Sequence, residues 1–204
     1  MTKKMEPITL TTDRLLLRPF QLTDVDDVYA YARDSEWARY LPVPSPYEYR
    51  HAVEFVARSV LAAWDANPVF AICMSGRCVG GINIRVDTSM GTAEIGYSIA
   101  RAHWGKGLVV EAAAAVMDWA FDEFGLAKIT ALADLANTRS SRVMEKLGMR
   151  RDGLLRSERP SDADPEVRQD MVIYSVLRDE WRAPASGQAA GPTIALTARD
   201  RRRP

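Results

Sequence analysis

Two glycines stand one residue apart, at positions 105 and 107, directly before an alanine-rich segment with helical spacing. Residues 93–100 precede them and have the composition of a β-strand. A strand that passes through a short loop into a helix gathers unpaired backbone N–H groups at the helix N-terminus, where the dipole adds about half a positive charge. The glycines let the main chain approach a ligand closely. The segment therefore predicts an anion site that favours phosphate or pyrophosphate.

The two best-known phosphate-binding motifs are absent from this segment. A Walker loop requires G-x-x-x-x-G-K-[ST], and a dinucleotide fingerprint requires a third glycine where this chain has Val110. Gly105 and Gly107 taken alone are equally compatible with a tight strand-to-helix turn that binds nothing. Further motifs are therefore needed to decide between the two interpretations.

The remaining pattern predicts a single α/β domain over residues 1–183, followed by a flexible tail at 184–204. The tail is rich in Gly, Pro, Ala and Ser and ends in an arginine cluster. Strands and helices alternate over short distances in the domain, which favours one mixed sheet with helices packed on it. The predicted strands are 14–20, 69–74, 79–86, 93–100, 128–133, 150–158 and 168–177, and the predicted helices are 22–34, 47–64, 108–124 and 138–148.

Composition limits the classes of function. Lys plus Arg equals Asp plus Glu at 27 each, which argues against nucleic-acid binding. No run of about 18 apolar residues is present, so neither a membrane span nor a secretory leader is expected. Cys73 and Cys78 flank a hairpin turn; a cross-strand disulfide fits this spacing, but reduced buried thiols are the expected state in a cytoplasmic protein. With only two histidines, no metal site is expected.

Motifs across about 170 residues resemble the GNAT superfamily of acetyl-CoA-dependent N-acetyltransferases, and within it the RimJ/RimL-like group that acetylates ribosomal-protein N-termini among other amines. Each motif is weak alone, but their order is specific. The motifs are Trp104-Gly105-Lys106-Gly107, Glu111-Ala112, Asn137-x-x-Ser140, Glu145-Lys146-Leu147-Gly148 and Arg178-Asp179-Glu180-Trp181.

This resemblance implies a GNAT fold, with a mixed, mostly antiparallel sheet of six to seven strands and about four flanking helices. Strands 93–100 and 128–133 would splay apart at one end, and the pantetheine arm of acetyl-CoA would lie in the gap. The amides of the glycine loop would hold the pyrophosphate. The residues implied in coenzyme binding are Ile99, Ala100, Trp104, Gly105, Lys106, Gly107, Leu108, Val109, Asn137 and Ser140.

Two positions depart from the superfamily pattern. Val109 stands where Gly or Ala is expected, and Met144 stands where many members carry the tyrosine that protonates the departing thiolate. Ser140 is therefore the predicted proton donor, because it resembles the serine that RimL-like enzymes use near the sulfur. Ser140 could equally stabilise the first turn of its helix, as a capping residue does.

Two glutamates compete for the role of general base. Glu94 lies on the strand that leads into the coenzyme gap, and Glu158 lies near the family's glutamate position. Counted from Ser140, Glu158 falls one residue short of that position, which Arg159 occupies, so a β-bulge would have to restore the register. Either carboxylate could instead be solvated or paired with an arginine. His103 is expected to be structural or exposed.

Direct attack of an amine on the thioester in a ternary complex is expected, because no cysteine lies in or beside the glycine loop. At pH 7 an α-amine is roughly 14% neutral and a lysine about 0.04%, so peptide or protein N-termini are the favoured acceptors. Small-molecule amines and a noncatalytic acyl-CoA-binding module stay open, as does a homodimer. The acceptor is expected between the proline loop 41–46 and the acidic turn 161–166.

Overall fold

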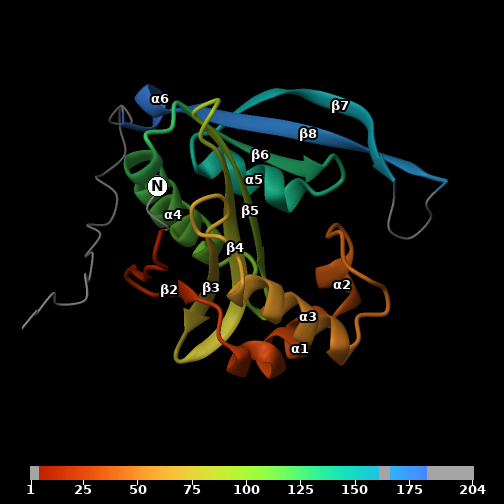
Figure 1. Cartoon of the computed structure of the whole chain (residues 1–204). Helices are drawn as coiled ribbons and strands as arrows, with labels where there is room; N and C mark the ends of the chain where they lie inside the picture. The colour runs from red at the N-terminus through yellow and green to blue at the C-terminus, as the bar shows by residue number, and fades with distance from the viewer. Residues whose placement is uncertain (1–4, 161–165, 183–204) are drawn as a thin grey trace, which may run out of the picture.

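The structure is a computed structural model that describes residues 5–160 and 166–182 (Figure 1). The predicted tail at 184–204, with its arginine cluster, lies outside the described residues. Most of the acidic turn 161–166 lies outside them as well. Within the described residues the chain forms one sheet with helices on both of its faces, as Figure 1 shows.

The sheet has eight strands in the order β1-β2-β3-β4-β5-β6-β8-β7, which confirms the predicted α/β architecture. Its neighbouring strands are antiparallel except for β5 and β6, which run parallel. The strand missed by the sequence pattern is β1, because two residues are too short to show an alternation. The strands are β1 (Leu10–Thr11), β2 (Leu16–Pro19), β3 (Val69–Met74), β4 (Arg77–Asp87), β5 (Thr92–Ile99), β6 (Lys128–Asp134), β7 (Arg150–Pro160) and β8 (Arg168–Leu177).

Six α-helices and two short 3-10 helices occur in the described residues, against about four helices expected. The two additional α-helices contain only four and five residues, below the length at which apolar periodicity is visible. The helices are η1 (Leu22–Asp24), α1 (Val25–Ala32), α2 (Ser35–Ala38), α3 (Tyr49–Val60), η2 (Arg101–His103), α4 (Leu108–Phe124), α5 (Thr138–Lys146) and α6 (Arg178–Arg182).

Two apolar clusters lie on opposite faces of the sheet. The larger joins α4 to the side chains of β2 to β6 and β8 that point toward it, among them Phe70, Ile84 and Ile129. The smaller lies under α1 and α3 and contains Phe20 and Val56. Burying one such side chain stabilises the folded state by roughly 1.5–3 kcal/mol. Apolar packing therefore stabilises both faces of the sheet, including the region where β5 diverges from β6.

The parallel contact between β5 and β6 is short. Only Thr92, Ala93 and Glu94 pair with β6, whereas β6 continues along β8 over its whole length. The two strands therefore part after Glu94, which is the splay that the family resemblance implies. β5 ends at Ile99, where the chain enters η2 and then the glycine loop.

Candidate active site

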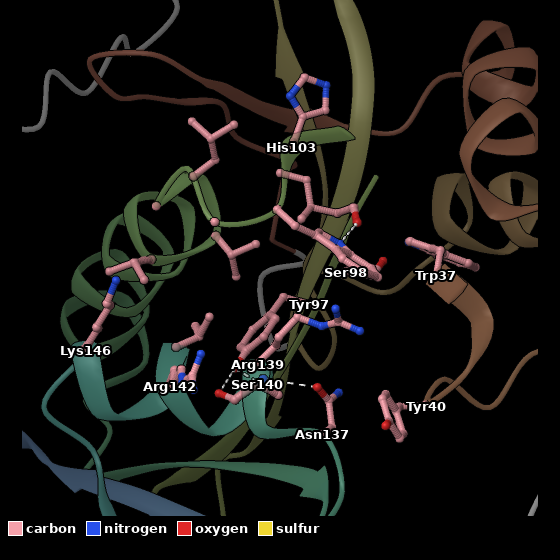
Figure 2. Close-up of a pocket in the computed structure, with 18 of the residues that line it drawn as sticks. Trp37, Tyr40, Tyr97, Ser98, His103, Asn137, Arg139, Ser140, Arg142 and Lys146 are labelled. Carbon is pink, nitrogen blue, oxygen red and sulfur yellow. Dashed lines mark hydrogen bonds between the residues drawn. The ribbon is translucent and has the colours of Figure 1, made fainter. Parts of the chain in front are cut away.

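A cleft of about 530 Å³ opens where β5 leaves β6. Its walls are the end of β5, the glycine loop, the N-terminus of α4, one face of α5, and α2 with the residues that follow it (Figure 2). Eight of the ten predicted coenzyme-binding residues line it: Ile99, Trp104, Gly105, Gly107, Leu108, Val109, Asn137 and Ser140. Segments that are distant in sequence thus form a single site.

Ala100 and Lys106 are the two predicted coenzyme contacts that are not among the lining residues. The N–H of Ala100 donates to the carbonyl of Val79 at 2.7 Å, so it faces the sheet. Hydrogen bonds alternate in direction along an antiparallel strand. The N–H groups of Tyr97 and Ile99 therefore point to the opposite side of β5, into the gap. Of the two amides considered for polarising the thioester, that of Ile99 has the required direction.

The glycine loop has the backbone that an anion site requires. Gly105 and Gly107 have φ values of 75° and 74°, a left-handed conformation that side-chain-bearing residues rarely adopt. The first intrahelical bond of α4 runs from the Glu111 N–H to the Gly107 carbonyl. The N–H groups of residues 108–110 are therefore free of helical partners and lie beside the exposed loop, where they can donate to a diphosphate.

A polar network holds the loop from the side away from the cleft. Arg14 donates to the Lys106 carbonyl at 2.9 Å and forms an ion pair with Glu111 at 2.6 Å. Thr12 donates to the same carboxylate at 2.5 Å. Burial alone would raise the pKa of Glu111, but these hydrogen bonds outweigh it and lower the pKa. The motif residue Glu111 therefore anchors the loop to the β1–β2 connection.

Helix α5 presents a row of cations to the cleft that the sequence reasoning did not assign. Arg139, Arg142 and Lys146 all line it. Their spacing of three and four residues places them on one helix face, and this spacing was the signal that could have revealed them. The Arg139 guanidinium lies 4.0 Å from the ring centroid of Trp104, and the Trp104 indole donates to the Ile99 carbonyl at 2.9 Å.

Asn137 and Ser140 occupy the N-terminus of α5. The Asn137 side-chain oxygen accepts from the Ser140 N–H at 3.2 Å, so Asn137 is the N-cap. The Ser140 hydroxyl lies 3.1 Å from the hydroxyl of Tyr97 on β5 (Figure 2). Burial raises the pKa of Tyr97 to about 12, and the hydrogen bond with Ser140 opposes that rise. The sequence reasoning missed Tyr97, because only the fold brings β5 against α5.

Neither predicted general base is among the residues lining the cleft. Glu94 lies where β5 is still paired with β6 and forms an ion pair with Arg85. Glu158 is exposed on β7. Between Leu155 and Arg159 the β7–β8 pairing shifts by two residues, whereas the family position required a shift of one. Arg159 is directed at the α2 side, where it donates to the Tyr40 carbonyl at 3.1 Å.

Glu36 of α2 is the one carboxylate among the described residues that line the cleft. It lies within 3.5 Å of Arg39 and 4.0 Å of Arg139, and its side chain is 45% exposed. Trp37 and Tyr40 also line the cleft, and Figure 2 shows Trp37 opposite Ser98 and Tyr40 opposite Asn137. This wall of the cleft is therefore built from α2 and the turn after it, close to the proline loop expected to contact the acceptor.

His103 also lines the cleft, and Figure 2 shows it above Ser98 in that view. Burial lowers the pKa of its imidazole, and the nearby Lys106 lowers it further. The imidazole is therefore neutral near pH 7. No cluster of three or more His, Cys, Asp or Glu side chains suited to a metal ion was found in residues 5–160 and 166–182. The same part of the chain contains no helix with the length and hydropathy needed to cross a bilayer.

Comparison with known proteins identifies the family of the chain. Residues 14–150 match the family described as Acetyltransferase (GNAT) domain. The chain is 32% identical to the uncharacterized N-acetyltransferase YnaD of Bacillus subtilis, over 84% of this chain and 98% of that protein. It is 31% identical to the putative ribosomal N-acetyltransferase YdaF of the same species, over 57% of this chain and 63% of that one.

A solved structure with the same architecture is Mycobacterium smegmatis RimJ in complex with CoA-disulfide. It matches with a TM-score of 0.76 and 23% identity, over 87% of this chain and 92% of that one. The chain belongs to the GNAT family and is an acetyl-CoA-dependent acetyltransferase. The motif order identified in the sequence predicted this family correctly.

Proposed function

We propose that this enzyme transfers the acetyl group of acetyl-CoA to the α-amine of a peptide or protein by direct attack in a ternary complex. The observation that carries the proposal is the cleft itself, which combines a donor loop for a diphosphate, a hydroxyl pair, and a carboxylate on the opposite wall. Acetyl-CoA supplies an acetyl thioester and leaves as the thiol. The remaining tasks fall to residues of the chain.

Coenzyme binding is assigned to the glycine loop and the start of α4. Three or four charge-assisted hydrogen bonds of about 1.5–3 kcal/mol each, from amides at 107–110, suffice for micromolar affinity after the cost of association. Arg142 and Lys146 add positive charge along the same wall. Val109 lies on the helix beside the loop and lines the cleft. Its backbone N–H is one of the donors assigned to the diphosphate.

The hydroxyl pair is assigned to the departing sulfur. A thiol has an ordinary pKa near 8.5, whereas the pKa of Tyr97 is about 12. Tyr97 therefore does not give up its proton to the thiolate permanently. Ser140 donates a hydrogen bond to the thiolate, and the Tyr97 hydroxyl then donates to the Ser140 hydroxyl in place of the Ser140 carbonyl. The proton balance closes because attack by the amine releases one proton and the thiolate takes one up.

The acceptor is assigned to the wall formed by α2. Glu36 is placed to bind the ammonium form of an amine and to accept its proton. An α-amine is the easiest amine to deprotonate, because about 14% of it is already neutral at pH 7. Deprotonating a lysine at the same pH costs roughly 3.5 kcal/mol more. The YdaF relative is named as a putative ribosomal N-acetyltransferase, and this supports a protein N-terminus as the acceptor.

A thiol-release assay with matched acceptors tests the proposal. The acceptors are a peptide with a free N-terminus and no lysine, the same peptide with a blocked N-terminus and one lysine, free amino acids, and aminoglycosides. Acetylation of the first peptide at least about tenfold faster than the second is expected. Preferential turnover of a small-molecule amine would replace the proposed acceptor, and coenzyme binding without turnover on any amine would indicate a noncatalytic module.

A further inference from the structure

The β3–β4 hairpin places two thiols directly opposite each other. Cys73 and Cys78 are register partners on the neighbouring strands, and the turn between them has Ser75 and Gly76 at φ values of 50° and 78°. Both side chains point into the cluster under α1 and α3. Partner Cα atoms in antiparallel strands lie about 4.5–5.5 Å apart, which is within the range of about 4.4–6.8 Å that a disulfide spans. Oxidation therefore requires no rearrangement of the strands.

The surroundings of the two thiols differ. The hydrogen bond with Cys78 lowers the pKa of Cys73; burial opposes this, and Arg18 of β2 reinforces it. The same hydrogen bond, together with burial and the charge of Asp24, raises the pKa of Cys78. Asp27 of α1 accepts a hydrogen bond from the Cys78 N–H at 2.9 Å and adds negative charge on that side. Cys73 is therefore the more acidic thiol of the pair, and the Cys78 thiol donates to the Gly80 carbonyl at 3.4 Å.

The two cysteines also differ in whether they line a cavity. A second cavity, of about 320 Å³, lies between the β1–β2 connection and the tip of the hairpin. Cys73 lines this cavity together with Arg14, Arg18 and Gly76, whereas Cys78 is not among its lining residues. Both residues are buried, with 4% of Cys73 and 3% of Cys78 exposed, so only the cavity distinguishes their access. A small reagent that enters the cavity meets Cys73 first, near the Arg18 guanidinium that favours its thiolate.

We propose that Cys73 and Cys78 form a redox-active dithiol site that is oxidised by low-molecular-weight disulfides through Cys73. The Cys73 thiolate attacks one sulfur of the reagent RSSR, which forms a Cys73–S–SR bond and releases RS⁻. Cys78 loses its proton to solvent and attacks the Cys73 sulfur, which forms the Cys73–Cys78 disulfide and releases a second RS⁻. The protein loses two electrons, and the reagent is reduced to two thiols once each RS⁻ takes up a proton.

The site is independent of the acetyl-transfer proposal, because neither cysteine lines the active-site cleft. It can be tested on the full chain, in which these are the two cysteines of the sequence. Reduced protein is incubated with oxidised glutathione, and its free thiols are then counted after denaturation and its mass is measured. The expected product is a monomer that has lost both thiols and two hydrogens, and that dithiothreitol restores.

Single variants test the order of attack. Cys78→Ser is expected to retain one glutathione on Cys73, because the resolving thiol is gone. Cys73→Ser is expected to react at least about tenfold more slowly than Cys78→Ser in the folded state, and at a similar rate in urea, where the surroundings are lost. Survival of both thiols in the folded wild type would overturn the site, as would equal reactivity of the two folded variants. The measurement on the wild-type protein tests whether both thiols are oxidised, even if a variant misfolds.

Discussion

The hydroxyl oxygen of Tyr97 lies 3.1 Å from the hydroxyl oxygen of Ser140, across the point where β5 separates from β6. The Tyr97 hydroxyl also lies 3.3 Å from the Ser140 carbonyl oxygen, to which it donates. Met144, at the position where many relatives carry a tyrosine, is fully buried in the core and cannot serve there. A tyrosine is therefore present at the catalytic end of α5, but it comes from the sheet and not from the helix.

Removing either hydroxyl is expected to slow the chemical step. Ser140→Ala should lower kcat by about 10–100-fold, because a hydrogen bond to a charged group contributes about 1.5–3 kcal/mol. Tyr97→Phe should lower kcat by roughly tenfold, and the double variant should fall short of the product of the two effects, because the groups act together. Steady-state kinetics with saturating acetyl-CoA would measure this, and an unchanged kcat in Ser140→Ala would contradict it.

The raised pKa of Tyr97 predicts a loss of folding stability at alkaline pH. Its pKa is raised from 10 to about 12, so the folded state keeps the phenol proton while the unfolded state releases it. The unfolded state binds fewer protons in this window, and stability must therefore fall as pH rises from 10 toward 12. The Tyr97 contribution to the loss should reach about 1 kcal/mol by pH 11. Urea unfolding of wild type and Tyr97→Phe, compared at pH 9 and pH 11, isolates it.

The glycine loop offers a matched pair of substitutions. Gly107→Ala and Gly91→Ala both place a side chain at a positive φ, of 74° and 63° respectively. Each should destabilise the protein by about 1–2 kcal/mol. Only Gly107→Ala should also raise the KM for acetyl-CoA, by about tenfold, because only that loop lies at the cleft. Equal KM values for the two variants would show that this loop does not bind the diphosphate.

The cations of α5 are expected to contribute to coenzyme affinity by charge. Arg142→Gln and Lys146→Gln should each weaken acetyl-CoA binding by about two- to fivefold at low salt, and the difference from wild type should shrink at high salt. Arg156→Gln on the exposed face of β7 is the control, because Arg156 is not among the cleft-lining residues. Calorimetry at two salt concentrations measures the effect. A loss that is independent of salt would point to packing.

The general base can be assigned by comparing three glutamates. Glu36→Gln is expected to lower kcat/KM for the acceptor by about tenfold or more while leaving acetyl-CoA affinity unchanged. Glu94→Gln and Glu158→Gln should stay within about twofold of wild type, because neither side chain is among those lining the cleft. If either of them loses more kcat/KM than Glu36→Gln, that glutamate is the general base, as the sequence predicted.

Much of the candidate coenzyme site could be predicted from sequence because it is local. The strand 93–100, the two glycines and the helix after them are contiguous, so their order alone places backbone donors at a helix N-terminus. Asn137 and Ser140 were assigned from the family resemblance, and both line the cleft. Short elements such as β1 and α2 were missed because two to four residues carry no periodic signal.

The carboxylate that lines the cleft could not be predicted from sequence, because its place depends on where strands and helices meet. Glu94 lies on the expected strand, but at the end where β5 is still paired with β6. Glu158 lies in a stretch whose register shifts by two residues, and it is exposed. Glu36 lies on a four-residue helix that no motif marks. A carboxylate becomes a candidate base only when packing brings it to the cleft.

The chain by itself determined the family, the positive-φ glycine loop and the order of elements, because these depend on neighbouring residues and on backbone sterics. Only the tertiary structure decided that Tyr97 meets Ser140, 43 positions away, and that Arg14 reaches Glu111, 97 positions away. Such contacts depend on how far β5 and β6 splay and on which face α4 covers. Those features result from burial of the whole apolar core, and no local pattern encodes them.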